Sequence, residues 1–303
     1  MLRSMRSSVK YISNYLATGK WVAYYEMTKP GITFTVVASM LMGFLIGSTG
    51  SFSYSLLFHA VFGTYLIAAG TAAHNQFIER KLDRLMNRTN SRPLPENRIT
   101  PREGLTFSLI LIFGGLIYLV LMVNWIAGLI SILTTAIYLG VYTPMKRVSF
   151  INMIIGAIPG ALPPVGGWAA TGASLMEPGV WILFGIVFLW QVPHVLAIAW
   201  LCSDDYQNAG FNMLPRNDEK GYKTAGFVLL FLGLLLPVVY ALYAINMAGM
   251  IYLIGGMLTT LAYLYYGIRF ALSRSKNNAK QLMFSSFVYL PVIWLFILVD
   301  LIF

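Results

Sequence analysis

Three oxygen-bearing side chains, Asn75, Glu79 and Asp83, are spaced four residues apart at the end of a long apolar stretch. On a helix of 3.6 residues per turn, each is rotated only about 40° from the one before, so all three share one face. Mg²⁺ is typically held by one or two carboxylates together with water and phosphate oxygens. We therefore predict a catalytic Mg²⁺ site at these three residues. The alternative is that the two acids only balance nearby positive charges.

A basic stripe accompanies these acids, with Arg80, Arg84 and Arg88 at four-residue intervals and Arg92 one turn further on. The spacing predicts that the helix continues until the prolines that follow residue 92 end it. A guanidinium group matches the oxygens of a diphosphate in a bidentate manner. Arg88 and Arg92 are therefore predicted to bind a diphosphate, unless the stripe serves only to orient the chain in a membrane.

A second acidic pair, Asp204 and Asp205, begins another long polar stretch. Taken alone, the pair fits the end of a helix, with Asn208 and Gly210 as stop signals. Two acidic clusters on one face, however, would hold two Mg²⁺ ions bridging a diphosphate, and would neutralise the charge that develops on it as a leaving group. We therefore add Asp204 and Asp205 to the predicted catalytic and metal-binding residues.

Between the two acidic clusters lies YTPMKR, residues 142–147. Lys146 is predicted to bind phosphate as a point charge, with Tyr142 beside it, although a turn with positively charged anchors explains the segment equally well. The proline-rich segment that follows contains Gly156 and Gly160. Small residues at this spacing favour either close helix packing or a cavity wide enough for a bulky planar ligand.

Gln191 and His194 lie within a further apolar stretch, FLWQVPHVLAIAW. A histidine in a membrane helix usually forms a hydrogen bond to another helix. His194 is also about ten residues, roughly 15 Å, from Asp204 along a helix axis, which suits contact with an acceptor substrate. His74, beside Asn75, competes for the same role.

The composition indicates the environment in which these residues act. Of the 303 residues, 58% are hydrophobic and only 11% are charged, whereas about a quarter of the residues in a soluble domain are charged. The mean hydropathy of +0.70 therefore predicts an outer surface that faces lipid. The single cysteine, Cys202, excludes a disulfide framework, and the sequence contains neither an HExxH pair nor a GxxxxGK[ST] loop.

Charged side chains are costly at the centre of a bilayer, so stretches without charges mark the possible spans. Three such stretches are long enough for two spans each and three for one each. The chain is therefore predicted to be an all-α membrane protein, a bundle of nine transmembrane helices. The predicted spans are 31–49, 53–78, 104–122, 125–143, 150–170, 179–202, 225–245, 248–270 and 281–301.

All 21 lysines and arginines fall on one predicted face of this bundle. Positively charged short loops stay in the cytoplasm, so the N-terminus is predicted inside and the C-terminus outside. The same topology explains the net charge of +10 without nucleic acid binding. Residues 1–29 are predicted to be a cytoplasmic surface segment, in preference to an organelle transit segment, and 30–303 a single transmembrane domain.

Three segments resemble the UbiA superfamily of intramembrane prenyltransferases and, within it, the protohaem IX farnesyltransferases. They are NQFIERKLDRLMNRTNSRPLP at 75–95, YTPMKR at 142–147, and WQVPH leading to DDYQNAGFNMLP at 190–215. The resemblance spans nearly the whole chain, and the last two segments are those specific to the haem-modifying branch. Many relatives carry aspartate at Glu79 and a further acid at Lys81, so the lysine removes one metal ligand that the family pattern implies.

The resemblance implies that farnesyl diphosphate, held through Mg²⁺, donates its farnesyl group to a vinyl group of haem B, which is a substrate and not a cofactor. It implies a bacterial plasma membrane or a mitochondrial inner membrane, and a product used by a haem A synthase or a terminal oxidase. Two alternatives remain. One is a prenyltransferase of the same fold that acts on a quinone precursor or another aromatic acceptor, and the other is a secondary transporter. Transporters usually place ionisable groups near the midplane, whereas the carboxylates here fall at predicted membrane boundaries.

Overall fold

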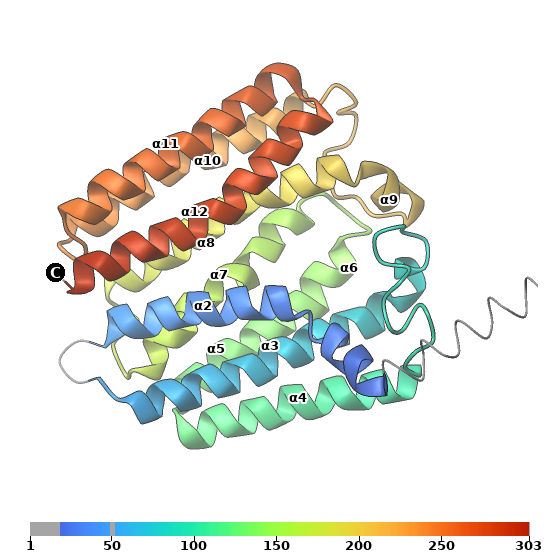
Figure 1. Ribbon diagram of the computed structural model, residues 1–303, viewed down its shortest axis with the longest axis horizontal. Helices are drawn as coiled ribbons and strands as arrows, with labels where there is room; N and C mark the ends of the chain where they lie inside the picture. Colours follow the sequence, from blue (N-terminus) through green and yellow to red (C-terminus); the bar gives the residue numbers. More distant parts are fainter. Residues whose placement is uncertain (1–18, 49–51, 303) are drawn as a thin grey trace, which may run out of the picture.

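The computed structural model describes residues 19–48 and 52–302, and within these ranges the chain forms helices and no β-strand (Figure 1). Nine of the helical segments described are long and apolar enough to cross a membrane. The predicted nine-helix membrane fold is therefore confirmed. The spans are α2 (Pro30–Gly47), α3 (Tyr54–Asp83), α4 (Pro101–Met122), α5 to α6 (Trp125–Met145), α7 (Asn152–Ala170), α8 (Pro178–Leu201), α10 (Tyr222–Ala244), α11 (Met250–Ser273) and α12 (Lys276–Ile302).

Polar side chains fix where several helices begin. The hydroxyl of Ser53 accepts a hydrogen bond from the backbone N–H of Leu56 at the start of α3. Thr100 and Glu103 form a reciprocal capping box at the start of α4. Such caps satisfy N–H groups that have no partner inside the helix. The capping box therefore defines where the long loop between α3 and α4 ends.

The prediction that α3 continues as a basic stripe to Arg92 is wrong. The helix ends at Asp83, and residues 84–100 form a loop of turns before α4 begins. The Thr89 hydroxyl donates a hydrogen bond to the backbone carbonyl of Asp83, and the Arg92 guanidinium turns back onto the Asp83 carboxylate. These contacts replace further helical turns, so the loop, and not helical spacing, positions Arg88 and Arg92.

The fourth span changes its helical form as it approaches the same end of the bundle. It begins as α5 (Trp125–Ala136), continues as a π-helical turn, η1 (Ile137–Tyr142), and finishes as the short α6 (Thr143–Met145). A π-turn contains one more residue per hydrogen-bonded turn than an α-helix and is often found at functional sites. Within it, the rings of Tyr138 and Tyr142 lie 5.2 Å apart.

Close packing of α2 on α7 depends on two glycines. A Cβ at Gly43 would lie 1.8 Å from the carbonyl oxygen of Pro164, and one at Gly167 would lie 1.9 Å from that of Met40. Real Cβ atoms do not approach so closely, so only glycine permits this backbone contact. The helix α7 nevertheless runs unbroken through its prolines.

The predicted pair Gly156 and Gly160 makes room for side chains. A Cβ at Gly156 would lie 2.5 Å from the ring of Tyr142, and one at Gly160 would lie 1.9 Å from the amide oxygen of Gln191. Both glycines also line the internal cavity described below. The two glycines therefore serve both interpretations of this segment, since they admit close side chains of neighbouring helical segments and also line the cavity.

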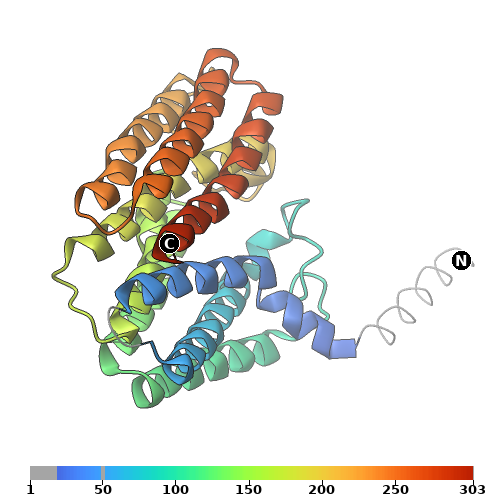
Figure 2. The ribbon, with the colours of Figure 1, turned by 60° about the vertical axis from the view of Figure 1, so that its left-hand side comes forward.

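The loop 84–100, α6 and α9 (Ser203–Asn208) gather at one end of the bundle, whereas the C-terminus lies at the other (Figure 1). The second view separates a layer of α10, α11 and α12 from α2, α3 and α4 (Figure 2). The polar chemistry is therefore concentrated at one end of the membrane domain.

Within the described part of the predicted N-terminal surface segment, residues 19–27 are helical. Ala23 and Met27 are buried in a small cluster with Ala73, whereas Trp21 is 85% exposed. Residues 1–18 lie outside the described part of the chain. The one-sided burial over 19–27 fits a helix that lies against the domain.

Candidate active site

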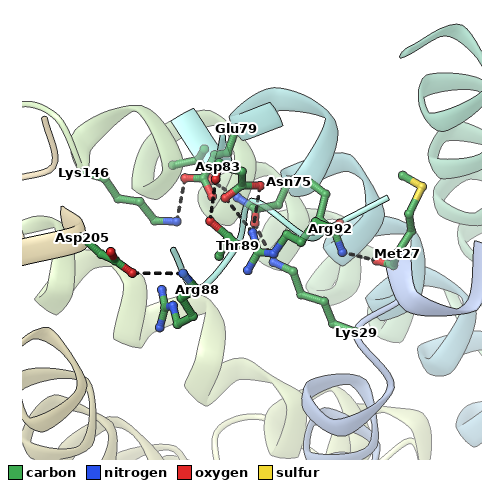
Figure 3. Close-up of polar contacts among 12 residues, drawn as sticks. Met27, Lys29, Asn75, Glu79, Asp83, Arg88, Thr89, Arg92, Lys146 and Asp205 are labelled. Atoms are coloured by element: carbon green, nitrogen blue, oxygen red, sulfur yellow. Dashed lines mark hydrogen bonds and ion pairs between the residues drawn. The ribbon is translucent and has the colours of Figure 1, made fainter. Parts of the chain in front are cut away.

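Each oxygen-bearing side chain predicted on α3 contacts a basic side chain (Figure 3). Asn75 accepts a hydrogen bond from Nζ of Lys29 at 2.8 Å. Glu79 forms an ion pair with Lys146, with 2.8 Å between Oε1 and Nζ. Asn75, Glu79 and Asp83 are all buried. The structure therefore places the three side chains of this helix face in one buried polar cluster.

The Asp83 carboxylate is the most enclosed of the three, with no exposed surface. One guanidinium nitrogen of Arg92 lies 2.8 Å from Oδ1 and 2.9 Å from Oδ2 of this carboxylate. Arg92, predicted as a diphosphate ligand, thus belongs to the cluster because the loop after α3 brings it back to Asp83. Lys146 and Arg92 balance the two carboxylates here, so protonation of Lys29 gives the cluster a net positive charge that an anionic ligand can neutralise.

Lys29 is a site residue that sequence reasoning missed. It caps α2 with a left-handed backbone, φ 47° and ψ 64°, a conformation that costs energy in a residue with a side chain. Burial first, and then the positive charge of Arg92, lower the pKa of the Lys29 ammonium to about 7, against the opposing effect of Glu79. The available signal was a lysine placed directly before the proline that begins a span.

Lys146 and Tyr142 reach the cluster from the fourth span. The Lys146 ammonium lies 4.6 Å from the centre of the Tyr142 ring, which is a cation–π distance. The Asn75 amide also donates a hydrogen bond to the Thr143 hydroxyl at 3.3 Å. Lys146, predicted as a phosphate ligand with Tyr142 beside it, thus lies in the cluster with the acids of α3.

Asp205 contacts the loop after α3. Its carboxylate accepts hydrogen bonds from the backbone N–H groups of Asn87 and Arg88, both at 3.1 Å, and from the Asn87 side chain. The Arg88 guanidinium donates to the Tyr206 hydroxyl at 2.9 Å. Asp205 thereby joins α9 to the loop that carries two predicted diphosphate ligands.

Asp204 points toward solvent, with 81% of its side chain exposed, and forms a loose ion pair with Lys276. Among the described residues, no hydrogen bond joins Asp204 or Asp205 to Asn75, Glu79 or Asp83. The two acidic segments predicted to share metal ions thus lie at the same end of the bundle, and Asp205 contacts the loop after α3 but not the three side chains on α3.

The donor set on α3 suits Mg²⁺ in its chemistry. It offers two carboxylates and one amide oxygen on consecutive helical turns, and Mg²⁺ binds through one or two carboxylates plus substrate phosphate and water. No group of three or more His, Cys, Asp or Glu residues close enough to share an ion occurs in the part of the chain described.

A cavity of about 690 Å³ opens beside this cluster and extends between the helices. Lys29 and Tyr142 line it at the polar end, and α2, α3, α5, α7, α8 and α12 contribute mostly apolar walls. Its volume is in the range of cavities that bind small molecules. The site thus combines a charged end with a long apolar space.

Of the three residues predicted to contact the acceptor, two line this cavity and one does not. Gln191 and His194 line it. Gln191 donates hydrogen bonds to backbone carbonyls of Ala157 and Val187. His74 lies 2.9 Å from the Ser108 hydroxyl on α4, and it is not among the residues that line the cavity. The geometry therefore favours His194 over His74 as the residue that meets an acceptor.

Comparison with solved structures supports the fold. A structure of digeranylgeranylglyceryl phosphate synthase aligns with a TM-score of 0.75 and 20% sequence identity, covering 93% of this chain and 99% of that one. A UbiA homologue from Archaeoglobus fulgidus, bound to DMAPP and Mg²⁺, aligns with a TM-score of 0.63 at 15% identity, covering 91% and 99% of the two chains.

Comparison of sequences identifies the family. The UbiA prenyltransferase family model matches residues 36–289. A protoheme IX farnesyltransferase from Solibacter usitatus is 40% identical over 286 residues, which is 91% of this chain and 98% of the relative. Another from Koribacter versatilis is 38% identical over 91% of this chain and 92% of the relative. The chain therefore belongs to the UbiA prenyltransferase family, and the relatives that it resembles across nearly its whole length are protoheme IX farnesyltransferases.

Proposed function

We propose that this membrane prenyltransferase transfers the farnesyl group of farnesyl diphosphate to a vinyl group of haem B and so forms hydroxyethylfarnesyl haem, haem O. The observation that carries the proposal is the cluster of Lys29, Lys146 and Arg92 around the acids of α3, from which Lys29 lines an apolar cavity. A ligand with a diphosphate head and an apolar tail matches this arrangement, because its head suits the basic cluster and its tail suits the cavity. The names of the similar relatives supply the acceptor.

The basic side chains would change partners when the diphosphate binds. In the structure Lys146 and Arg92 are bound to Glu79 and Asp83. A diphosphate carries more negative charge than the two carboxylates, so it would draw these cations toward its oxygens. The same movement would free the carboxylates for Mg²⁺. Arg88, at the edge of the loop, would add a further donor.

We assign Mg²⁺ to Asn75, Glu79 and Asp83, with Asp204 and Asp205, at the same end of the bundle, as the further residues of the metal site. When bound, Mg²⁺ neutralises the charge that develops on a leaving diphosphate. The protein's own contribution is to hold the diphosphate head at the end of the bundle, by Lys29, Lys146 and Arg92, while the farnesyl chain lies in the cavity.

The reaction breaks the bond between C1 of the farnesyl group and the diphosphate oxygen, and the electron pair leaves with the diphosphate. The haem vinyl group then supplies the electrons for a new carbon–carbon bond. Water adds to the remaining cationic carbon and loses a proton, which leaves the hydroxyl group of the product. The apolar walls exclude other water, which would otherwise quench the first cation.

Haem B would occupy the part of the cavity lined by Gln191 and His194, and would not contact His74, which lies outside the lining and pairs with Ser108. The chain is an integral membrane protein. We further propose the bacterial plasma membrane as its location, because the similar relatives are bacterial. The product would then pass to a haem A synthase or a terminal oxidase.

The test is a reconstitution with purified protein, haem B, farnesyl diphosphate and Mg²⁺, followed by chromatography for a more hydrophobic haem. A parallel reaction replaces haem B with an aromatic quinone precursor. We expect a farnesylated haem that requires Mg²⁺ and no product from the quinone precursor. Prenylation of the quinone precursor alone would overturn the acceptor assignment while leaving the diphosphate site in place.

A further inference from the structure

The imidazole of His194 is fixed in orientation on the wall of the cavity. Its ring stacks on the Trp190 indole, with 5.3 Å between ring centres and 15° between planes. The Phe287 ring meets it edge-on at 4.9 Å. His194, Trp190 and Phe287 all line the cavity. A ring held between two aromatic neighbours presents the same edge to any ligand that enters.

One nitrogen of this imidazole is already engaged. Nδ1 of His194 lies 2.6 Å from the hydroxyl oxygen of Ser286 on α12. That hydroxyl in turn donates its single proton to the backbone carbonyl of Met283. Ser286 therefore has no proton left to give to the histidine and must accept one from it. The proton of the neutral imidazole is thereby located on Nδ1.

Ser286 is itself held firmly. Its backbone carbonyl accepts a hydrogen bond from the Trp190 indole at 2.8 Å, and the Trp190 carbonyl accepts one from the Tyr263 hydroxyl at 3.3 Å. These bonds connect α8, α11 and α12 around the imidazole. The orientation of His194 is thus built into the packing of three helices.

With the proton on Nδ1, Nε2 of His194 carries a free lone pair. Within the described residues, no hydrogen bond engages this nitrogen. A histidine whose one nitrogen donates to a fixed acceptor, leaving the other bare, has the arrangement of a metal-ligating histidine. A bare Nε2 cannot donate a hydrogen bond to a carboxylate, so the imidazole is unsuited to a haem propionate.

We propose that Nε2 of His194 is the axial ligand of the acceptor's haem iron and that Ser286 is the positioning residue that keeps this nitrogen unprotonated. The proposal rests on the proposed function, because it takes haem as the acceptor. Axial ligation would fix the distance of the porphyrin from the α8 wall. It would leave the porphyrin edge free to meet the farnesyl chain that shares the cavity.

The test is the optical and electron paramagnetic resonance spectrum of ferric haem B titrated into purified protein in lipid nanodiscs, without farnesyl diphosphate. The wild-type protein is expected to show a histidine-ligated haem. His194→Gly is expected to lose that signature and to bind haem at least about tenfold more weakly, as loss of a metal ligand does. Added imidazole should restore the signature in His194→Gly by entering the space left by the side chain.

His74→Gly is the matched control, because His74 also contacts a serine hydroxyl, that of Ser108, but does not line the cavity. Its haem spectrum is expected to equal that of the wild type. Ser286→Ala removes the proton acceptor without touching the iron. It is expected to retain a histidine ligand with haem affinity reduced roughly tenfold, as for other residues that orient a metal ligand.

The outcomes separate the inference from the proposed function. Wild-type protein that binds no haem would overturn both. Wild-type protein whose haem spectrum and affinity are unchanged in His194→Gly would overturn the ligand assignment alone. A thermal shift with farnesyl diphosphate and Mg²⁺ verifies that each variant is folded. If His194→Gly fails that check, an unaltered haem affinity in Ser286→Ala overturns the assignment.

Discussion

One guanidinium nitrogen of Arg92 lies 2.8 Å and 2.9 Å from the two carboxylate oxygens of Asp83, nine residues earlier in the chain. The pair closes the end of α3 and neutralises the most deeply buried carboxylate of the site. The same two side chains are assigned to different ligands during the reaction, Asp83 to Mg²⁺ and Arg92 to the diphosphate. Binding of Mg²⁺ and the diphosphate therefore has to break this ion pair.

Asp83→Asn is expected to lower the rate of farnesyl transfer at least about a hundredfold, because an amide retains the shape of the side chain but not the charge that binds Mg²⁺. The measurement is product formation at saturating Mg²⁺ and farnesyl diphosphate. Glu96→Gln is the control, since Glu96 pairs with Arg98 in the same loop. A near-normal rate in Asp83→Asn would remove this residue from the metal site.

Lys29→Met is expected to raise the KM for farnesyl diphosphate about tenfold or more, because the variant lacks the cation of the cluster that lines the cavity and can bind the diphosphate. Initial rates over a range of farnesyl diphosphate concentrations provide the measurement. Lys81→Met, on the exposed side of α3, serves as the control and should leave this KM unchanged. Equal KM values for the wild type and Lys29→Met would contradict the role given to Lys29.

The two acids of α9 are expected to behave differently. Asp205→Ala removes the acceptor of the Asn87 and Arg88 N–H groups, so hydrogen–deuterium exchange in this part of the loop should become faster. Asp204→Asn should leave that exchange unchanged and still abolish turnover through loss of a metal ligand. Normal turnover in Asp204→Asn at saturating Mg²⁺ would exclude Asp204 from the metal site.

Gly160→Ala is expected to weaken acceptor binding, because the added Cβ would overlap the amide of Gln191 and push it into the cavity. The readout is the affinity for haem B compared with that for farnesyl diphosphate. Gly233→Ala, where nothing lies within 4 Å of an added Cβ, is the matched control on α10. Equal haem affinity in both variants would show that Gln191 has space to move aside.

The predicted topology is tested with single cysteines introduced in a Cys202→Ala background. Ser174 and Ser275 are both exposed and lie in different loops. A cysteine at 174 is expected to react with an impermeant reagent in intact cells, and one at 275 only after permeabilisation, because the positively charged loops stay inside. The reverse pattern would overturn the assignment of the cytoplasmic face.

The sequence predicted the parts of the site that follow from local rules. The nine spans follow from the cost of charge in hydrocarbon and from the positions of the charged residues along the chain. The shared face of Asn75, Glu79 and Asp83 follows from helical geometry. Both kinds of inference need only residues close together in the chain.

The parts that could not be predicted depend on tertiary contacts. The end of α3 is set by Arg92 and Thr89, which fold back onto Asp83. The four-residue spacing of the arginines predicts a continuing helix and cannot predict that the chain folds back. Lys29 reaches Asn75 across 46 positions of sequence. Asp205 lies 118 positions from the loop backbone that it binds. No helical periodicity encodes distances of that kind.

The π-turn at Ile137–Tyr142 also sets the rotational phase of the chain that follows it. Each residue of an α-helix turns the chain by about 100°. Removing one residue here would leave the hydropathy of the span almost unchanged, yet would rotate Lys146 away from Glu79. Relatives in which this lysine pairs with the same glutamate must therefore align across residues 137–146 without gaps. A one-residue gap in this segment would identify a homologue in which the two residues do not form this ion pair.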